Sequence, residues 1–98
     1  MRVVTAPEEC IYLPTDIKCF LAGGITNCPD WQHDVVEVLR GFEAKHLGEL
    51  DDLVLFNPRR ENFPINDPNA ALEQITWEFK WLQQMDIFSM WFSGGSSD

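Results

Sequence analysis

The sequence predicts an α/β fold, a three-layer arrangement in which helices cover both faces of a doubly wound parallel sheet. Three short apolar segments, 17–24, 53–57 and 87–92, have the composition of buried strands. Two longer segments with apolar residues at helical spacing, 30–47 and 67–84, lie between them. Strands that alternate with amphipathic helices favour a parallel sheet with right-handed crossovers.

The first strand and the first helix are marked by the residues at their ends. The run "IKCFLAGG" is closed by Gly23 and Gly24, which indicates a tight turn after the strand. Asp30 can cap the helix that follows, because a carboxylate there accepts hydrogen bonds from the first turn. The apolar face that we expect on this helix consists of Trp31, Val35, Val38, Leu39 and Phe42.

The rest of the chain continues this alternation. The strand in "LVLFNPRR" is stopped by Asn57 and Pro58, because proline cannot donate to a strand ladder. Asp67 and Pro68 supply a cap and a first residue for the second helix. The expected apolar face of that helix consists of Leu72, Ile75, Phe79, Leu82 and Met85. The final run "IFSMWF" is almost continuously apolar, which is typical of a strand covered on both faces, and we take the start of the chain as a polar lead-in.

We expect the strand order 2-1-3, numbering the three predicted strands along the chain, with the ligand site at the carboxyl ends of strands 1 and 3. Strand 3 is then an edge, although it is the most apolar strand, and apolar edges promote aggregation unless they are paired. We therefore expect residues 1–98 to form a single domain that is the first part of a larger sheet, completed by a continuation of the chain or by a second chain.

Charge and composition exclude several classes of partner. The net charge of −9 argues against nucleic acid and against an anionic membrane surface, since both require clustered Lys and Arg. No apolar segment is long enough to span a membrane and the first residues lack the apolar core of a secretory signal, so we expect a cytoplasmic protein.

Neither a metal nor an organic cofactor is indicated. Cys10, Cys19 and Cys28 form no CxxC pattern, and we expect reduced thiols in packing roles. His33 and His46 have no second ligand at helical spacing, and we expect surface histidines.

The candidate ligand-binding residues follow the predicted strands or interrupt an apolar face. Asn57, Arg59 and Arg60 follow strand 2, where a guanidinium can hold a phosphate or a carboxylate, or can simply balance nearby acids in a solvated loop. Glu78 lies beside the apolar face of the second helix, so its carboxylate either reaches solvent or an ion-pair partner or points into a pocket.

Glycine and tryptophan residues complete the candidate set. Gly23 and Gly24 permit a close approach of a ligand to the backbone. Tryptophans are expected mainly in the core, and Trp31, beside the glycine turn, is the one for which we expect a ligand contact. Asp30, next to it, is a further candidate for substrate binding.

The blocks "FLAGGI", "PDWQ", "NPRR" and "ITWEF....MDIFSMWF", in this order and spacing, resemble the nucleoside 2-deoxyribosyltransferase-like family from Ile17 onward. The resemblance implies a flavodoxin-like (Rossmann-like) fold with a five-stranded parallel sheet, an oligomeric state, and action on the N-glycosidic bonds of nucleosides or nucleotides. In such enzymes a glutamate attacks the anomeric carbon, releases the base and forms a glycosyl ester that a second base or water resolves. This chemistry requires no cofactor.

The resemblance also assigns positions. It implies that Gly23 and Gly24 form the turn near the substrate, that Glu78 is the acid that contacts the base, and that Asp98 binds the sugar hydroxyls. The nucleophilic glutamate of the family is expected after Asp98, so the catalytic residue is unknown within this sequence.

Three functions remain open at this point. The chain can be part of a nucleoside or nucleotide deoxyribosyltransferase or hydrolase, a module of the same fold that binds a nucleotide derivative without turnover, or a scaffold whose last strand recruits another sheet. Free base released from deoxynucleosides, ligand affinity after substitution of Arg59 and Arg60, and the oligomeric state distinguish them.

Overall fold

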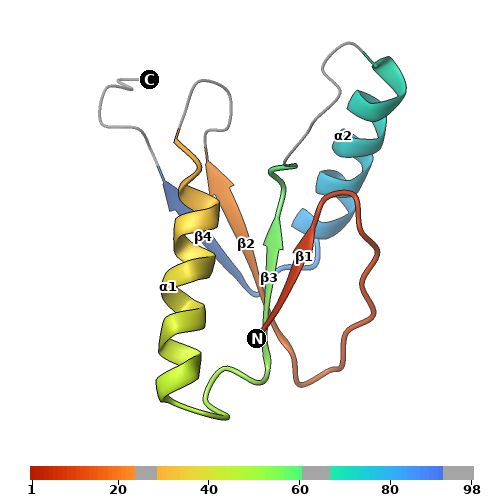
Figure 1. Ribbon diagram of the computed structural model, residues 1–98. Coiled ribbons are helices and arrows are strands. Elements are labelled where there is room, and N and C mark those ends of the chain that lie inside the picture. The colour runs from red at the N-terminus through yellow and green to blue at the C-terminus, as the bar shows by residue number, and fades with distance from the viewer. Residues whose placement is uncertain (24–28, 61–66, 92–98) are drawn as a thin grey trace.

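The computed structural model describes residues 1–23, 29–60 and 67–91 (Figure 1). Its elements follow one another as β1 (Arg2–Thr5), β2 (Ile17–Gly23), α1 (Trp31–Lys45), β3 (Leu53–Asn57), α2 (Pro68–Leu82) and β4 (Ile87–Trp91). The predicted α/β class is confirmed, and both helices lie inside the ranges predicted for them. Two predicted site residues, Gly24 and Asp98, lie outside the described residues.

The strands form one four-stranded parallel sheet in the order β1-β3-β2-β4. The predicted order 2-1-3 is therefore wrong as a description of the sheet, because it omits β1. Val3 and Val4 pair with Leu55 and Phe56 of β3, so the presumed lead-in contains a strand. Of the three segments recognised from the sequence, β2 lies in the middle, with β3 on one side and β4 on the other.

Helix α1 covers one face of the sheet. Asp30 caps it as predicted, since its Oδ1 accepts a hydrogen bond from the His33 backbone N–H at 3.0 Å. Trp31 and Val36 pack against Leu21 and Leu55, the strand residues that point to this face. The predicted apolar face is partly wrong, because Val38 is 71% exposed and Val36 takes the buried position; Gln32 is buried as well.

Helix α2 covers the opposite face, but with a different side from the one predicted. Trp77 and Trp81 pack on Phe20 and Phe56, with the Trp81 and Phe56 ring centroids 4.7 Å apart. Ala70 is the third buried residue of the helix. The predicted face is wrong because its four helical members are exposed: Leu72, Ile75, Phe79 and Leu82.

The start of β4 is fastened to β2 by a charged pair. The Asp86 carboxylate accepts hydrogen bonds from the Lys18 backbone N–H at 2.8 Å and from its ammonium at 3.2 Å, and the Asp86 N–H donates to the Lys18 carbonyl at 2.9 Å. These bonds lower the pKa of Asp86 below its usual value, with the backbone N–H as the main cause. The Lys18 ammonium also lies 4.3 Å from the centre of the Tyr12 ring.

Strand β4 forms one border of the described sheet. Ile87 is 49% exposed and Phe88 is 51% exposed, although both belong to the most apolar run of the sequence. The prediction of an apolar edge strand therefore agrees with the described residues, and what pairs with this edge stays a prediction.

Candidate functional site

A pocket of about 340 Å³ lies where β1 and β3 end and α1 begins. It brings together three of the residues singled out from the sequence, Asp30, Asn57 and Arg59. In open α/β sheets, ligands bind outside the carboxyl ends of the strands. The remaining lining residues are Val3, Thr5, His33 and Val36.

Hydrogen bonds hold the Arg59 side chain in one orientation at the N-terminus of α1. Its Nη1 donates to the Pro29 carbonyl at 2.7 Å, and its Nε lies 3.8 Å from Oδ1 of Asp30. The Arg59 backbone N–H donates to Oδ1 of Asn57 at 2.9 Å, which fixes the turn after β3. The Arg59 side chain is 19% exposed and borders the pocket. A preoriented guanidinium of this kind suits a phosphate or a carboxylate.

Asp30 is already engaged by the fold. Its Oδ1 caps α1 and lies near the Arg59 guanidinium, so this carboxylate serves to position the pocket wall. His33, in the first turn of α1, is an exposed histidine as predicted, and its Nε2 lies 3.9 Å from Oε1 of Glu37.

Gln32 is a polar residue of this region that sequence reasoning did not single out. Its side chain is fully buried, and its Oε1 lies 3.5 Å from Nη1 of Arg59. Its Nε2 has no hydrogen-bond partner among the described residues, and an unpaired buried amide costs about 1–3 kcal/mol. Its place in the sequence, directly after Trp31, gives no signal of burial.

Arg60 and Glu78 belong to a second network, on the α2 side of the sheet. Arg60 donates from Nε to Oε1 of Gln74 at 2.9 Å and from Nη2 to Glu73 at 2.7 Å. The Gln74 amide donates to the Pro58 carbonyl at 2.7 Å and to Oε2 of Glu78 at 2.9 Å. The Gln74 side chain thus uses its carbonyl and both amide hydrogens to join the end of β3 to α2. Neither Arg60 nor Glu78 lines the pocket that contains Arg59.

The other two described candidates are the last residue of β2 and the first residue of α1. Gly23 has φ 147°, a backbone conformation that L side chains rarely adopt, so glycine is required there for a conformational reason. Trp31 is 5% exposed and packs in the core with Cys19 and Leu21. The tryptophan for which a ligand contact was expected is therefore a core residue in this structure.

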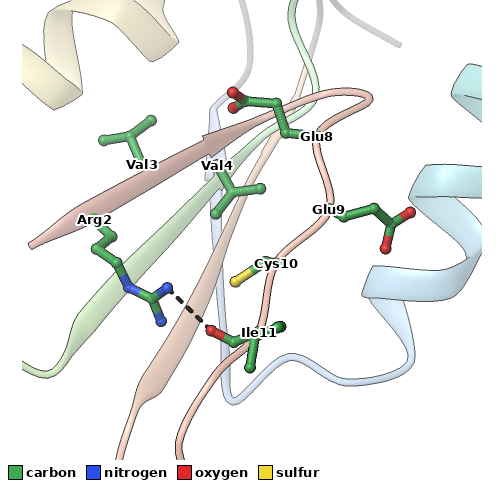
Figure 2. Close-up of a pocket in the computed structure, with 7 residues that line it drawn as sticks. All are labelled: Arg2, Val3, Val4, Glu8, Glu9, Cys10 and Ile11. Carbon is green, nitrogen blue, oxygen red and sulfur yellow. Dashed lines mark hydrogen bonds between the residues drawn. The ribbon is translucent and has the colours of Figure 1, made fainter.

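A larger hollow of about 520 Å³ lies along the outer edge of β1 (Figure 2). Its lining comes from β1 and the segment that follows, and Arg2 spans the two by donating to the Ile11 carbonyl at 3.1 Å. Oε1 of Glu8 accepts a hydrogen bond from the Thr5 backbone N–H at 2.7 Å. None of the predicted site residues lines this hollow, and its Arg2 and Glu8 side chains are hydrogen-bonded to nearby backbone groups. We therefore assign the candidate site to the smaller pocket.

Metal and thiol chemistry receive no support from the described part of the chain. It contains no cluster of three or more His, Cys, Asp or Glu that could hold a metal ion. Burial raises the pKa of the Cys19 thiol, which keeps it protonated and unreactive at neutral pH. Over the same residues, neither helix is long and apolar enough to cross a membrane.

These features define a doubly wound α/β protein with polar groups gathered at the carboxyl ends of its strands. The chain belongs to the nucleoside 2-deoxyribosyltransferase-like family, which matches residues 16–98, and the family predicted from the sequence is confirmed. A search of curated proteins finds no match. Strand β1 precedes the matched range, so Val3 and Thr5 of the pocket come from outside the family match.

Proposed function

We propose that the chain binds a nucleoside or a nucleotide at the carboxyl ends of its strands and takes part in breaking or exchanging the N-glycosidic bond. The observation that carries the proposal is the convergence of Arg59, Asn57 and the first turn of α1 on one pocket in a member of this family. Family membership supports a nucleoside ligand, and the preoriented guanidinium supports recognition of a phosphate or another anionic group.

The proposed reaction follows the retaining pattern of glycosyl transfer. A glutamate carboxylate attacks the anomeric carbon as the bond to the base breaks, and the base leaves with a proton. A second base or a water molecule then attacks the same carbon and releases the glutamate. The resemblance to the family implies that this glutamate comes after Asp98, so we assign the nucleophile to no residue from 1 to 98. We retain Gly23, Gly24, Glu78 and Asp98 as proposed substrate contacts.

The experiment is to incubate the chain with deoxynucleosides and with their 5′-monophosphates, measuring free base by chromatography and binding by calorimetry. Arg59→Ala should weaken binding of the monophosphates by about 10-fold to 100-fold, because charge-assisted hydrogen bonds contribute about 1.5–3 kcal/mol. Arg40→Ala, which removes an exposed arginine of α1 outside the pocket, is the matched control. Unchanged affinity in a folded Arg59→Ala variant would exclude this residue from the site.

A second function, binding without turnover, is favoured by the composition of the pocket. Among its described lining residues the carboxylate is Asp30, which caps α1 and lies near Arg59. A module of this kind gives calorimetric binding of a nucleotide and no free base. Base release that survives purification to homogeneity would exclude it.

We also keep as a proposal that a further strand pairs with β4, supplied by a continuation of the chain or by another chain. The half-exposed Ile87 and Phe88 support it. Hydrogen exchange tests it, because an unpaired edge leaves alternate backbone amides of β4 in fast exchange with solvent, whereas a paired edge protects them.

A further inference from the structure

Strand β1 adds a wall to the candidate site that the family match does not include. The match begins at residue 16, whereas β1 ends at Thr5 and pairs with β3 at one border of the sheet (Figure 1). Val3 and Thr5 nevertheless line the pocket together with residues of β3 and α1. Membership of the family therefore does not account for what this wall of the pocket recognises.

Thr5 lies on the face of the sheet that the pocket occupies. Successive residues of a strand point to opposite faces. Val4 packs in the cluster under α2 and Val3 packs against the cluster under α1, so Thr5 belongs to the α1 face. Its register partner in β3 is Asn57, which belongs to the same face as Leu55. Thr5 and Asn57 therefore lie next to each other at the border of the pocket.

Glu8 fixes the end of β1 by bonding to both backbone groups of Thr5. Oε1 of Glu8 accepts a hydrogen bond from the Thr5 N–H at 2.7 Å, and the Glu8 N–H donates to the Thr5 carbonyl at 2.8 Å. No described residue forms a hydrogen bond with the side-chain hydroxyl of Thr5. A threonine hydroxyl can donate one hydrogen bond, so this group is available to a ligand in the pocket.

Three kinds of hydrogen-bond donor border the pocket. Oδ1 of Asn57 accepts a hydrogen bond from the Arg59 backbone N–H at 2.9 Å, which fixes the amide orientation and leaves its NH₂ group as a donor. Arg59 contributes its guanidinium and Thr5 its hydroxyl. Phosphate oxygens accept hydrogen bonds from arginine, asparagine and threonine side chains alike. This set of donors therefore suits a phosphate group better than a neutral hydroxyl.

The negative charge of the chain makes each of these donors important. Asp30 also lines the pocket, but its Oδ1 accepts a hydrogen bond from the His33 N–H at 3.0 Å and lies 3.8 Å from Nε of Arg59, so part of its charge is offset. The net charge of −9 repels an anion at longer range. Binding of a phosphate therefore depends on local donors, and the loss of one of them should be measurable.

We propose that Thr5 is a specificity-determining residue of this pocket, whose hydroxyl donates a hydrogen bond to the phosphate of a nucleotide and so favours the nucleotide over the free nucleoside. The inference rests on the proposed function, because it requires a ligand of this class in the pocket. The pocket volume of about 340 Å³ lies in the range of small-molecule sites.

Calorimetric titration with a deoxynucleoside and with its 5′-monophosphate tests the proposal. Thr5→Val should weaken binding of the monophosphate on the order of 10-fold, because it removes a hydrogen bond to a charged group. It should leave the affinity for the nucleoside unchanged, and valine suits a strand, so the variant should fold. Thr5→Ser keeps the hydroxyl and should bind the monophosphate within about threefold of the unaltered chain.

Thr76→Val is the matched control, because it removes the hydroxyl of an exposed threonine of α2 that lies outside the pocket. This variant should bind both ligands as the unaltered chain does. Circular dichroism shows whether each variant is folded. A purely structural role of Thr5 would weaken binding of the nucleoside and of the monophosphate together, so the ratio of the two affinities separates that role from phosphate recognition.

A double variant tests whether Thr5 and Arg59 hold the same group. Two side chains that bind one phosphate are energetically coupled, so their losses do not add. In the Arg59→Ala background, Thr5→Val should therefore weaken binding of the monophosphate by clearly less than the roughly 10-fold expected for Thr5→Val alone. Fully additive losses would show that the two side chains contact different parts of the ligand, which overturns a shared phosphate site.

The remaining outcomes separate this inference from the proposed function. If Arg59→Ala weakens binding of the monophosphate and a folded Thr5→Val does not, the role of Thr5 is overturned and the proposed function stands. Equal losses of the two affinities in Thr5→Val also overturn it. If the unaltered chain binds neither ligand, the proposed function fails and this inference fails with it.

Discussion

Two tryptophans of α2 allow a matched test of how hydrogen bonding shapes the core. Trp77 and Trp81 are 4% and 2% exposed and pack in the same cluster. The Trp77 indole N–H donates to the Glu8 carbonyl at 2.7 Å, whereas the Trp81 indole N–H has no partner among the described residues. Replacing each by phenylalanine removes the same atoms and leaves a similar cavity, so the difference between the variants isolates the indole N–H.

Trp77→Phe loses a cavity contribution of about 1–2 kcal/mol and a hydrogen bond worth about 1 kcal/mol, for a total loss of about 2–3 kcal/mol. Trp81→Phe loses a similar cavity contribution but removes an unsatisfied buried donor, which offsets about 1–3 kcal/mol. We therefore expect Trp81→Phe to be nearly neutral and the gap between the variants to be about 2 kcal/mol, or roughly 8–16 °C in Tm for a domain of this size.

Urea denaturation followed by far-UV circular dichroism measures this gap, because indole fluorescence would change with the number of tryptophans. The slope of unfolding free energy against urea should be the same in both variants, which shows that only stability has changed. If Trp81→Phe loses as much stability as Trp77→Phe, the assignment of an unpaired indole at Trp81 is refuted.

Three further predictions concern the ends of the strands. Gly23→Ala should lower the free energy of unfolding by about 1–3 kcal/mol, because the backbone there has φ 147°; a calorimetric Tm equal to that of the parent chain would contradict this. Gln74→Leu should destabilise the chain by about 2–3 kcal/mol, because it leaves the Pro58 carbonyl and the Arg60 guanidinium without their amide partner, and denaturant midpoints test it. The pKa of Asp86 is lowered in the folded state, so its contribution is present above about pH 4, the ordinary range of an aspartate, and is lost as the pH falls through the lower folded value. Asp86→Asn should accordingly destabilise the chain at neutral pH and lose that effect in strong acid, below the folded pKa; an unfolding midpoint that differs from the parent equally under both conditions argues against the pair.

The alternation of strands and helices was predictable because each element carries its own local signal. Asp30 and the Asp67-Pro68 pair mark where the helices begin, and the structure starts α1 and α2 directly after the two aspartates. Strand β1 was missed because Arg2–Thr5 is short and is followed by a proline-containing polar segment, so its pairing with β3 depends on residues far along the chain. A four-residue strand has too little pattern to identify by itself.

The orientation of α2 was not predictable from periodicity, because this helix has two apolar sides. The stripe from Leu72 to Leu82 and the set Ala70, Trp77 and Trp81 both recur at helical spacing. The tryptophans face the sheet because their large rings fill the space above Phe20 and Phe56. The size and shape of the side chains decide which side of α2 faces the sheet, and a hydrophobic pattern carries no information about either.

The candidate site was predictable only in part. The sequence placed the ligand site at the carboxyl ends of the strands now labelled β2 and β4, whereas the pocket lies at the ends of β1 and β3. Asn57 and Arg59 follow β3 directly, so the rule that ligands bind at carboxyl ends found them. Thr5 was missed because β1 was missed. Arg60 is separated from Arg59 because Arg59 contacts the start of α1 whereas Arg60 contacts α2 on the other face of the sheet.

The side chains of these two arginines, neighbours in the turn after β3, make contacts on opposite faces of the sheet. Arg60 is committed through Gln74 and Glu73 to fastening α2, while Arg59 borders the pocket. Selectivity at the proposed ligand site should therefore be tested by varying Arg59 and not Arg60, since a change at Arg60 would loosen the attachment of α2 to the end of β3.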